Sequence, residues 1–246
     1  GKVSRFADIF EYIMQIAKQQ PITLFIDEFQ EFLRINASIY SDMQRIWDLH
    51  KNEVHINLIV GGSVQSLIHK IFESNKEPLY NRQTAIIRVN KFPPSVLKEI
   101  LAFHNPNYTQ DDLLALYSFT GGVAKYAELL MDKGATTRSK MIETIVQADS
   151  IFLSEGKNLL IEEFGKDYGI YFSILTAIAS GHTQRSQIED MIGKEIGGYL
   201  TMLEDSYGII HKHKPLFTTK NSNIHYRLND NFLTFWFRFL FKYNHM

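Results

Sequence analysis

The feature that most restricts the fold is a short apolar run that ends in two acids. The run ITLFI at residues 22–26 is followed directly by Asp27 and Glu28. An apolar run of this length predicts a central parallel strand that is buried on both faces. Its two carboxylates then lie at the carboxyl edge of the sheet, where open α/β sheets bind ligands.

The segments around this strand predict the rest of an α/β layer. Apolar spacing predicts helices over residues 5–19, 39–51 and 64–72. Further apolar runs predict a second strand at residues 56–60, which leads into Gly61-Gly62-Ser63, and a third at residues 84–89. Strands that alternate with helices indicate a parallel sheet with right-handed crossovers.

The alternation stops after Pro93-Pro94, and two further domains are predicted. Residues 93–155 have a helical pattern with a break at Gly121-Gly122. The last part predicts three helices, a hairpin and a final aromatic helix, an order typical of a winged-helix domain. We therefore expect a partial α/β core with a parallel sheet at 1–92, a helical lid subdomain at 93–155 and an α+β winged helix at 156–246. Within the last domain, we expect helices at 158–180, 184–192 and 195–206, strands at 208–213 and 224–228, a polar loop at 218–223 and a helix from Asn231.

Composition excludes several classes of protein. The chain has no cysteine, which excludes disulfides and thiolate zinc sites and favours a reducing, cytoplasmic location. The formal net charge of −1 gives no overall attraction to nucleic acid or to an anionic membrane. The most apolar stretch, 232–241, is interrupted by Arg238 and is too short to span a bilayer.

The acidic strand end suits nucleoside triphosphate hydrolysis. An aspartate in the place of Asp27 holds Mg²⁺ through water, and an adjacent glutamate such as Glu28 orients and deprotonates the attacking water. The alternative is an ordinary strand that ends in a solvated acidic turn. Ser63 favours the catalytic interpretation, because the end of the next strand would place it beside the acids as a sensor of the terminal phosphate.

Three segments resemble the AAA-related, STAND-like ATPases of archaea and anaerobic bacteria. LFIDEFQE at residues 24–31 is similar to the Walker B strand of that family, and PLYNRQTA at residues 78–85 resembles its Leu-Tyr-Gly-Arg segment. FTGGVAKY at residues 119–126 resembles its Gly-Gly-Val-Pro-Lys-Tyr turn. The order and spacing agree through most of the chain, but Asn81 replaces the usual glycine and Ala124 the usual proline.

The resemblance implies a parallel-sheet ATPase that uses ATP and Mg²⁺. It implies that Arg82 faces the phosphates, in cis or from a neighbouring subunit, and that Lys125 acts as a second phosphate sensor. The alternative for Arg82 is a surface arginine that precedes a strand. Asn81 and Ala124 both lie at turns, so they bear on how Arg82 and Lys125 are positioned.

The phosphate-binding loop G-x-x-x-x-G-K-[ST] is absent from this sequence. In the resembling family that loop lies upstream of the acidic strand. The chain begins with Gly1 instead of Met, and we expect it to be an internal fragment of a larger ATPase. We expect the fragment by itself neither to bind nucleotide tightly nor to hydrolyse it.

The C-terminal part offers candidate partner surfaces. Lys212, Lys214 and Lys220 form a basic patch on the hairpin that suits DNA phosphates, although solvated lysines are the plainer interpretation. The expected recognition helix, 195–205, holds three acids and no arginine, which is poor for reading bases. The aromatic helix 232–241 is a candidate surface for a missing C-terminal domain or a second subunit.

Three functions therefore compete. The first is a parent ATPase whose nucleotide cycle drives a conformational switch. The second is an origin-recognition-like ATPase that binds DNA through the winged helix. The third is an interaction scaffold with a degenerate core. The acidic recognition helix and the near-neutral net charge argue against the second, and we expect the first.

Overall fold

The chain divides into two compact units, residues 1–87 and 88–246. The computed structural model describes residues 5–214 and 224–242. The structure is mixed α/β with a helical majority. Each unit is described by itself.

Unit 1 is built on two parallel strands, which are the first two of the three that the sequence predicts. β1 (Ile22–Ile26) pairs with β2 (Ile56–Val60), and Phe25 lies opposite Ile59. The helices of this unit are α1 (Phe6–Ala17), α2 (Phe32–Asn36), α3 (Ser38–His50) and α4 (Gln65–Glu73), with a single 3-10 turn at Phe29–Glu31.

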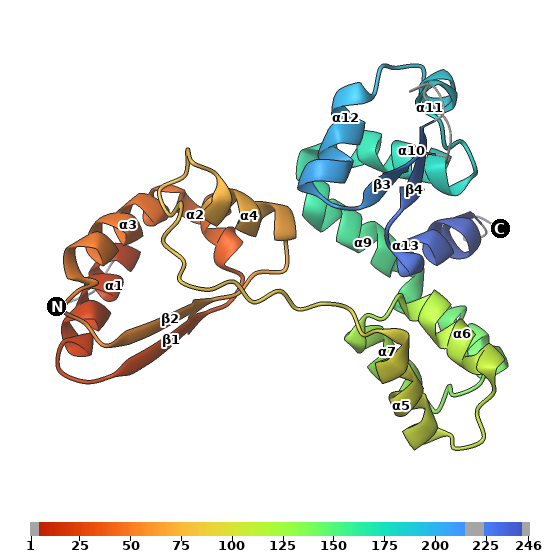
Figure 1. Ribbon diagram of the computed structural model, residues 1–246, viewed down its shortest axis with the longest axis horizontal. Coiled ribbons are helices and arrows are strands. Elements are labelled where there is room, and N and C mark those ends of the chain that lie inside the picture. The colour runs from red at the N-terminus through yellow and green to blue at the C-terminus, as the bar shows by residue number, and fades with distance from the viewer. Residues whose placement is uncertain (1–4, 215–223, 243–246) are drawn as a thin grey trace. The chain divides into compact units, whose positions relative to one another are not determined.

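The sheet of unit 1 is covered on one face only. Helices α1 and α3 lie on the same side of the strands (Figure 1), and their apolar faces bury Phe10 and Ile46 against it. The opposite face carries Phe25, 59% exposed, and Ile59, 42% exposed. Among the described residues the expectation of strands buried on both faces is therefore wrong, because the helices of this unit pack on a single side.

The third predicted strand, residues 84–89, does not form in the described structure. The segment pairs with neither β1 nor β2, which pair with each other. Ile87 is 88% exposed and Val89 is 97% exposed. The composition suits a strand, but a strand must be paired with another strand, and among the described residues this segment belongs to neither sheet.

The structure explains why asparagine is accepted at position 81. Asn81 has φ of +57° and donates its backbone N–H to the Phe72 carbonyl at 3.1 Å. Asparagine tolerates this left-handed conformation better than other residues that carry a Cβ. Asn81 can therefore adopt the left-handed backbone conformation for which glycine is best suited.

This interpretation predicts the effects of two substitutions. Asn81→Ala is expected to lower the free energy of unfolding of unit 1 by about 1 kcal/mol, and Asn81→Gly to change it little. Urea denaturation would measure both changes through Trp47, in a Trp236→Phe background that leaves one tryptophan. Equal losses in the two variants would mean that the asparagine side chain, and not its backbone conformation, stabilises this turn.

The described part of unit 2 is helical apart from one hairpin. The break predicted at Gly121-Gly122 is confirmed, with φ of +60° and +81°. Ala124 is the first residue of the helix that follows, a position that also suits proline. The helices are α5 (Pro94–His104), α6 (Gln110–Thr120), α7 (Ala124–Asp132), α8 (Arg138–Ile145), α9 (Phe152–Phe164), α10 (Tyr168–Ala179), α11 (Arg185–Ile192), α12 (Gly197–Thr201) and α13 (Asn231–Phe235).

Two predictions for this unit differ from the structure in detail. The expected helix 158–180 is two helices, because Gly165 adopts φ of +53° at the end of α9. The expected helix 195–206 begins at Gly197 and continues from α12 as a π-helical turn, Met202–Ser206. The predicted hairpin is confirmed, since β3 (Ile210–His213) and β4 (His225–Leu228) pair antiparallel. The predicted loop 218–223 lies outside the described residues.

The C-terminal aromatic helix belongs to the core of unit 2. α13 continues as a π-helical segment, Trp236–Phe241, and Trp236 and Phe237 are buried. The ring of Phe235 lies 4.6 Å from that of Phe119 on α6. One hydrophobic cluster therefore joins the predicted lid to the predicted winged helix. Of the apolar side chains on this helix, only Phe239 is more than half exposed, at 57%.

In the part of the chain that the structure describes, no helix combines the length and the apolar character needed to cross a bilayer.

Candidate functional site

The two acids and Ser63 meet at one edge of the sheet in unit 1. Asp27 and Glu28 follow β1, and Gly61, Gly62 and Ser63 follow β2. Because the strands are parallel, both segments leave the sheet at its carboxyl edge. Backbone bonds fasten them together: the Gly61 N–H donates to the Ile26 carbonyl, and the Phe29 N–H donates to the Gly61 carbonyl, both at 2.8 Å.

Glu28 and Ser63 are in direct contact. The Ser63 hydroxyl donates to Glu28 Oε2 at 2.8 Å, and the Ser63 N–H lies 3.4 Å from the same oxygen. The side-chain amide of Gln30 also donates to Oε2. These hydrogen bonds, from Gln30 and then from Ser63, hold the pKa of the Glu28 carboxyl below its ordinary value. The group is therefore ionised at neutral pH, as a general base must be.

The backbone of Glu28 is in an uncommon conformation. Its φ and ψ are 47° and 44°, in the left-handed region that costs a residue with a Cβ about 1–2 kcal/mol. The chain turns here from β1 into the 3-10 turn, and the buried Phe29 fixes that turn. The Tyr40 hydroxyl donates to the Phe29 carbonyl at 2.9 Å. The surrounding contacts therefore maintain an unfavourable backbone conformation at Glu28, the residue predicted to be the catalytic base.

Asp27 is exposed and has the donor chemistry that Mg²⁺ prefers. Its Oδ1 accepts the Glu28 N–H at 3.0 Å. A Cβ at position 61 would lie 3.1 Å from the same oxygen, so Gly61 leaves room beside the carboxylate. Mg²⁺ is commonly held by one or two carboxylates together with water and phosphate oxygens, and Asp27 fits such a site. The described residues contain no group of three or more acids or histidines that could hold a metal without such further ligands.

Arg82 lies in unit 1, where it is hydrogen-bonded to Asp48 and to two backbone carbonyls. Its Nη2 donates to Asp48 Oδ2 at 2.7 Å and its Nε donates to Asp48 Oδ1 at 3.3 Å. Its Nη1 donates to the carbonyls of Pro78 and Tyr80, at 2.8 and 3.2 Å. The bond from Arg82 also lowers the pKa of Asp48. In this structure Arg82 fastens its own segment to α3, and a contact with phosphate stays a prediction.

Lys125 lies in unit 2, near the start of α7, with an exposed side chain. The structure does not place it relative to Asp27 and Glu28, which belong to the other unit. Its role as a phosphate sensor therefore stays a prediction as well.

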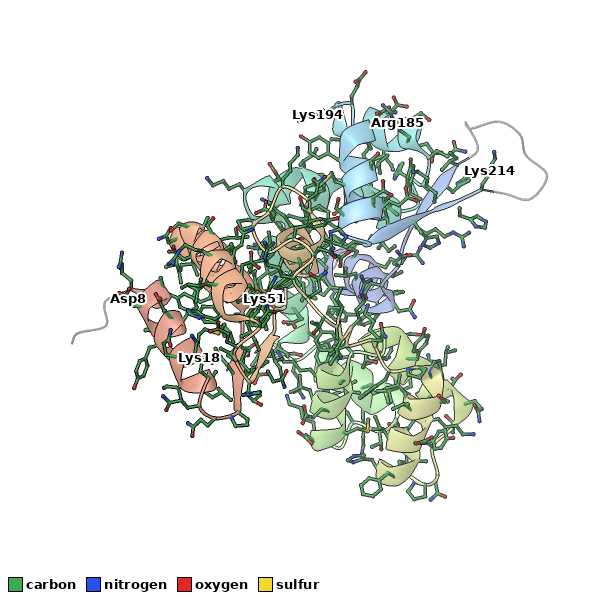
Figure 2. The ribbon with its side chains drawn as sticks, turned by 60° about the vertical axis from the view of Figure 1, so that its left-hand side comes forward. Asp8, Lys18, Lys51, Arg185, Lys194 and Lys214 are labelled. Carbon is green, nitrogen blue, oxygen red and sulfur yellow. The ribbon has the colours of Figure 1, made fainter. Side chains whose placement is uncertain are left out.

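The basic hairpin is less basic than its sequence suggests. Lys212 pairs with Glu204, which follows α12, and the hydrogen bond to that carboxylate raises the pKa of Lys212. Figure 2 shows Lys214 at the end of β3, where it is exposed. Lys220 lies outside the described residues. Of the three candidate DNA contacts, Lys212 is thus already neutralised by an acid.

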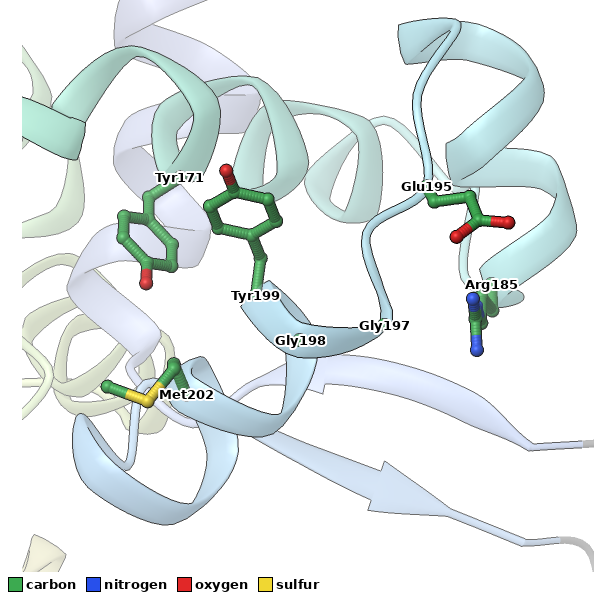
Figure 3. Close-up of a pocket in the computed structure, with 7 residues that line it drawn as sticks. All are labelled: Tyr171, Arg185, Glu195, Gly197, Gly198, Tyr199 and Met202. Atoms are coloured by element: carbon green, nitrogen blue, oxygen red, sulfur yellow. The ribbon is translucent and has the colours of Figure 1, made fainter.

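A pocket in unit 2 does not resemble a triphosphate site. It holds about 470 Å³ and is shown in Figure 3. One arginine and one glutamate line it together with aromatic and small residues, so its charges offset each other. None of the residues predicted to bind or hydrolyse nucleotide lines this pocket. The lining residues are Tyr171, Arg185, Glu195, Gly197, Gly198, Tyr199 and Met202.

Sequence reasoning gave no role to Gln30 and Gly62. Gln30 is 1% exposed and contacts Glu28, and a Cβ at position 62 would lie 2.3 Å from Gln30 Oε1. Only a weak indication of their roles is present in the sequence: Gln30 lies two residues after Glu28, and Gly62 directly precedes Ser63.

Sequence comparisons find two uncharacterized relatives of this chain. No family model matches the chain. It is 29% identical over 222 residues to the uncharacterized protein MJECL04 of Methanocaldococcus jannaschii, over 89% of this chain and 48% of that protein. It is also 32% identical over 56 residues to the uncharacterized protein MJ0424 of the same organism, over 23% of this chain and 54% of that protein. The chain thus spans about half the length of the curated relatives it matches.

Among solved structures, the chain is similar to the Walker-type ATPase PABY2304 of Pyrococcus abyssi. The TM-score is 0.67 and the identity 16%, over 96% of this chain and 69% of that one. At this identity the likeness shows a P-loop ATPase-like fold and does not show the activity.

Proposed function

We propose that this chain is part of an AAA-related, STAND-like ATPase whose ATP cycle drives a conformational switch. One observation carries the proposal: Asp27, Glu28 and Ser63 meet at the carboxyl edge of two parallel strands, with the Ser63 hydroxyl 2.8 Å from Glu28. This arrangement provides an ionised base and a second carboxylate at the edge where parallel sheets bind ligands.

Each residue at this edge of the sheet has a separate role in the proposed hydrolysis. Glu28 accepts a proton from the attacking water and orients that water toward the terminal phosphate. Asp27 holds Mg²⁺ through water, and a bound Mg²⁺ neutralises charge on the phosphates. Ser63 holds the Glu28 carboxylate in place, and its role as a sensor of the terminal phosphate stays a prediction. Arg82 is a candidate for phosphate contact only if it leaves Asp48.

The bare face of the sheet supports a larger core. Parallel sheets are nearly always covered on both faces, yet Phe25 and Ile59 form an exposed apolar pair. The strand-like segment 84–89 is a second apolar feature, since it exposes Ile87 and Val89 and belongs to neither of the described sheets. Further strands and helices that carry the phosphate-binding loop would cover the first and pair with the second.

The test is ATP binding and hydrolysis by a longer version of the protein that includes a phosphate-binding loop, beside the chain of 246 residues. We expect Mg²⁺-dependent hydrolysis by the longer protein alone, since the shorter chain has no loop to neutralise the triphosphate. A longer protein that binds no nucleotide would instead support an interaction scaffold with a degenerate core.

DNA binding is not part of the proposal. The pairing of Lys212 with Glu204 and the acids of the segment 195–205 both oppose contact with phosphates. A missing domain or second subunit on the aromatic helix stays a prediction: Trp236 and Phe237 are buried within unit 2, and Phe239 is exposed.

A further inference from the structure

Gln30 is a buried polar residue next to the proposed catalytic glutamate. It lies in the 3-10 turn that follows Glu28 and is 1% exposed. A buried amide is costly unless its polar atoms are hydrogen-bonded. Its Nε2 has one partner among the described residues, which is Glu28 Oε2.

The contacts of Glu28 are unequal at its two carboxylate oxygens. Oε2 accepts from Gln30 and from the Ser63 hydroxyl, so donors that follow β1 and β2 both hold it. Oε1 accepts no hydrogen bond from the described residues. One oxygen is therefore fixed by the protein, while the other is available to a water molecule.

Gly62 makes room for this amide. A Cβ at position 62 would lie 2.3 Å from Gln30 Oε1 and 2.5 Å from Ile68 Cδ1, so any larger residue would displace one of these groups. Since Ile68 packs against the core of unit 1, the Gln30 amide is the group more easily displaced. Glycine at this position keeps the amide against Glu28.

We propose that Gln30 is a positioning residue that fixes Oε2 of Glu28, so that Oε1 receives the proton of the attacking water. The inference rests on the proposed function for the role of Glu28. It adds Gln30, and Gly62 behind it, to the residues on which hydrolysis depends. Gln30 itself touches neither nucleotide nor water in this role.

The contact can be tested on the chain of 246 residues without nucleotide. The measurement is the side-chain amide resonances of Gln30 in an ¹⁵N-correlation spectrum, and their exchange with solvent. We expect one amide proton to exchange slowly, and Glu28→Ala to shift it and speed its exchange. The matched control is Glu31→Ala, which removes the neighbouring acid that pairs with Arg34. Resonances that Glu28→Ala leaves unmoved would overturn the proposal.

The role in hydrolysis is tested in the longer protein. Gln30→Met keeps the length of the side chain and removes its amide. We expect it to lower kcat by about 10- to 100-fold with KM little changed, because a small displacement of the general base slows proton transfer from water. Gly62→Ala is expected to act in the same direction. In a Glu28→Gln background, Gln30→Met should cause no further loss, because Gln30 acts through Glu28.

A further loss of similar size in that background would show a merely structural role and overturn the proposal. If the wild-type longer protein hydrolyses no ATP, the proposed function fails, and the resonances of Gln30 alone decide whether it holds Glu28. The two failures are therefore distinguishable.

Discussion

Glu28→Gln in the longer protein is expected to lower kcat for ATP hydrolysis by about 100- to 10,000-fold, the range that a general base contributes. The amide still accepts a hydrogen bond from Ser63, which donates at 2.8 Å in the wild type. It cannot take a proton from water. Nucleotide affinity should change little, because Glu28 is not assigned to the phosphates or the metal. Steady-state hydrolysis and equilibrium binding of a fluorescent ATP analogue would measure the two effects separately.

The matched control is Glu31→Gln. Glu31 lies three residues away in the same segment and pairs with Arg34 on the surface, at 3.2 Å. The substitution makes the same chemical change without touching Ser63 or Gln30, so the rate should stay within about twofold, as expected for a surface pair of small energetic weight. A similar loss in both variants would argue against Glu28 as the base.

Gly122→Ala is expected to destabilise unit 2 by about 2–5 kcal/mol, which combines a left-handed backbone cost with a steric clash. Gly122 has φ of +81°, and a Cβ there would lie 2.3 Å from the Phe92 carbonyl oxygen. The Phe92 N–H donates to the Gly122 carbonyl at 2.7 Å, so the two backbones are held together and neither can easily move away. Urea denaturation followed by Trp236 fluorescence, in a Trp47→Phe background, would measure the loss.

Gly134→Ala separates the two causes. Gly134 also has a positive φ, +64°, but no atom lies within 4 Å of a Cβ built there. It should lose only the backbone cost of about 1–2 kcal/mol. Equal losses at the two positions would show that the close approach of Phe92 contributes nothing.

Local pattern was sufficient for much of the fold. The run at residues 22–26 and the run at 56–60 form strands because each is short, apolar and followed by polar or glycine residues. The break at Gly121-Gly122 follows from the backbone freedom of glycine, and the sequence showed it directly. Asp27, Glu28 and Ser63 could be grouped in advance, because parallel strands end at the same edge of a sheet.

Other features depended on contacts between distant segments. The segment 84–89 has the composition of a strand, but pairing needs a neighbour that composition does not reveal. Arg82 binds Asp48, 34 residues away in the sequence, and Lys212 binds Glu204, so both charges are already paired. Neither pairing can be read from charge spacing alone.

The sequence by itself determined the ends of β1 and β2, the acidic pair and the helical break at Gly121-Gly122, because these depend on residue type and local spacing. Only the tertiary structure shows which residues contact one another. Gln30 and Ser63 both donate to one oxygen of Glu28, and Gly62 lies beside the Gln30 amide. The aromatic helix packs against Phe119. The physical reason is that backbone preference acts over a few residues. The direction of a side chain and the identity of its partner are fixed by packing between segments far apart in the chain.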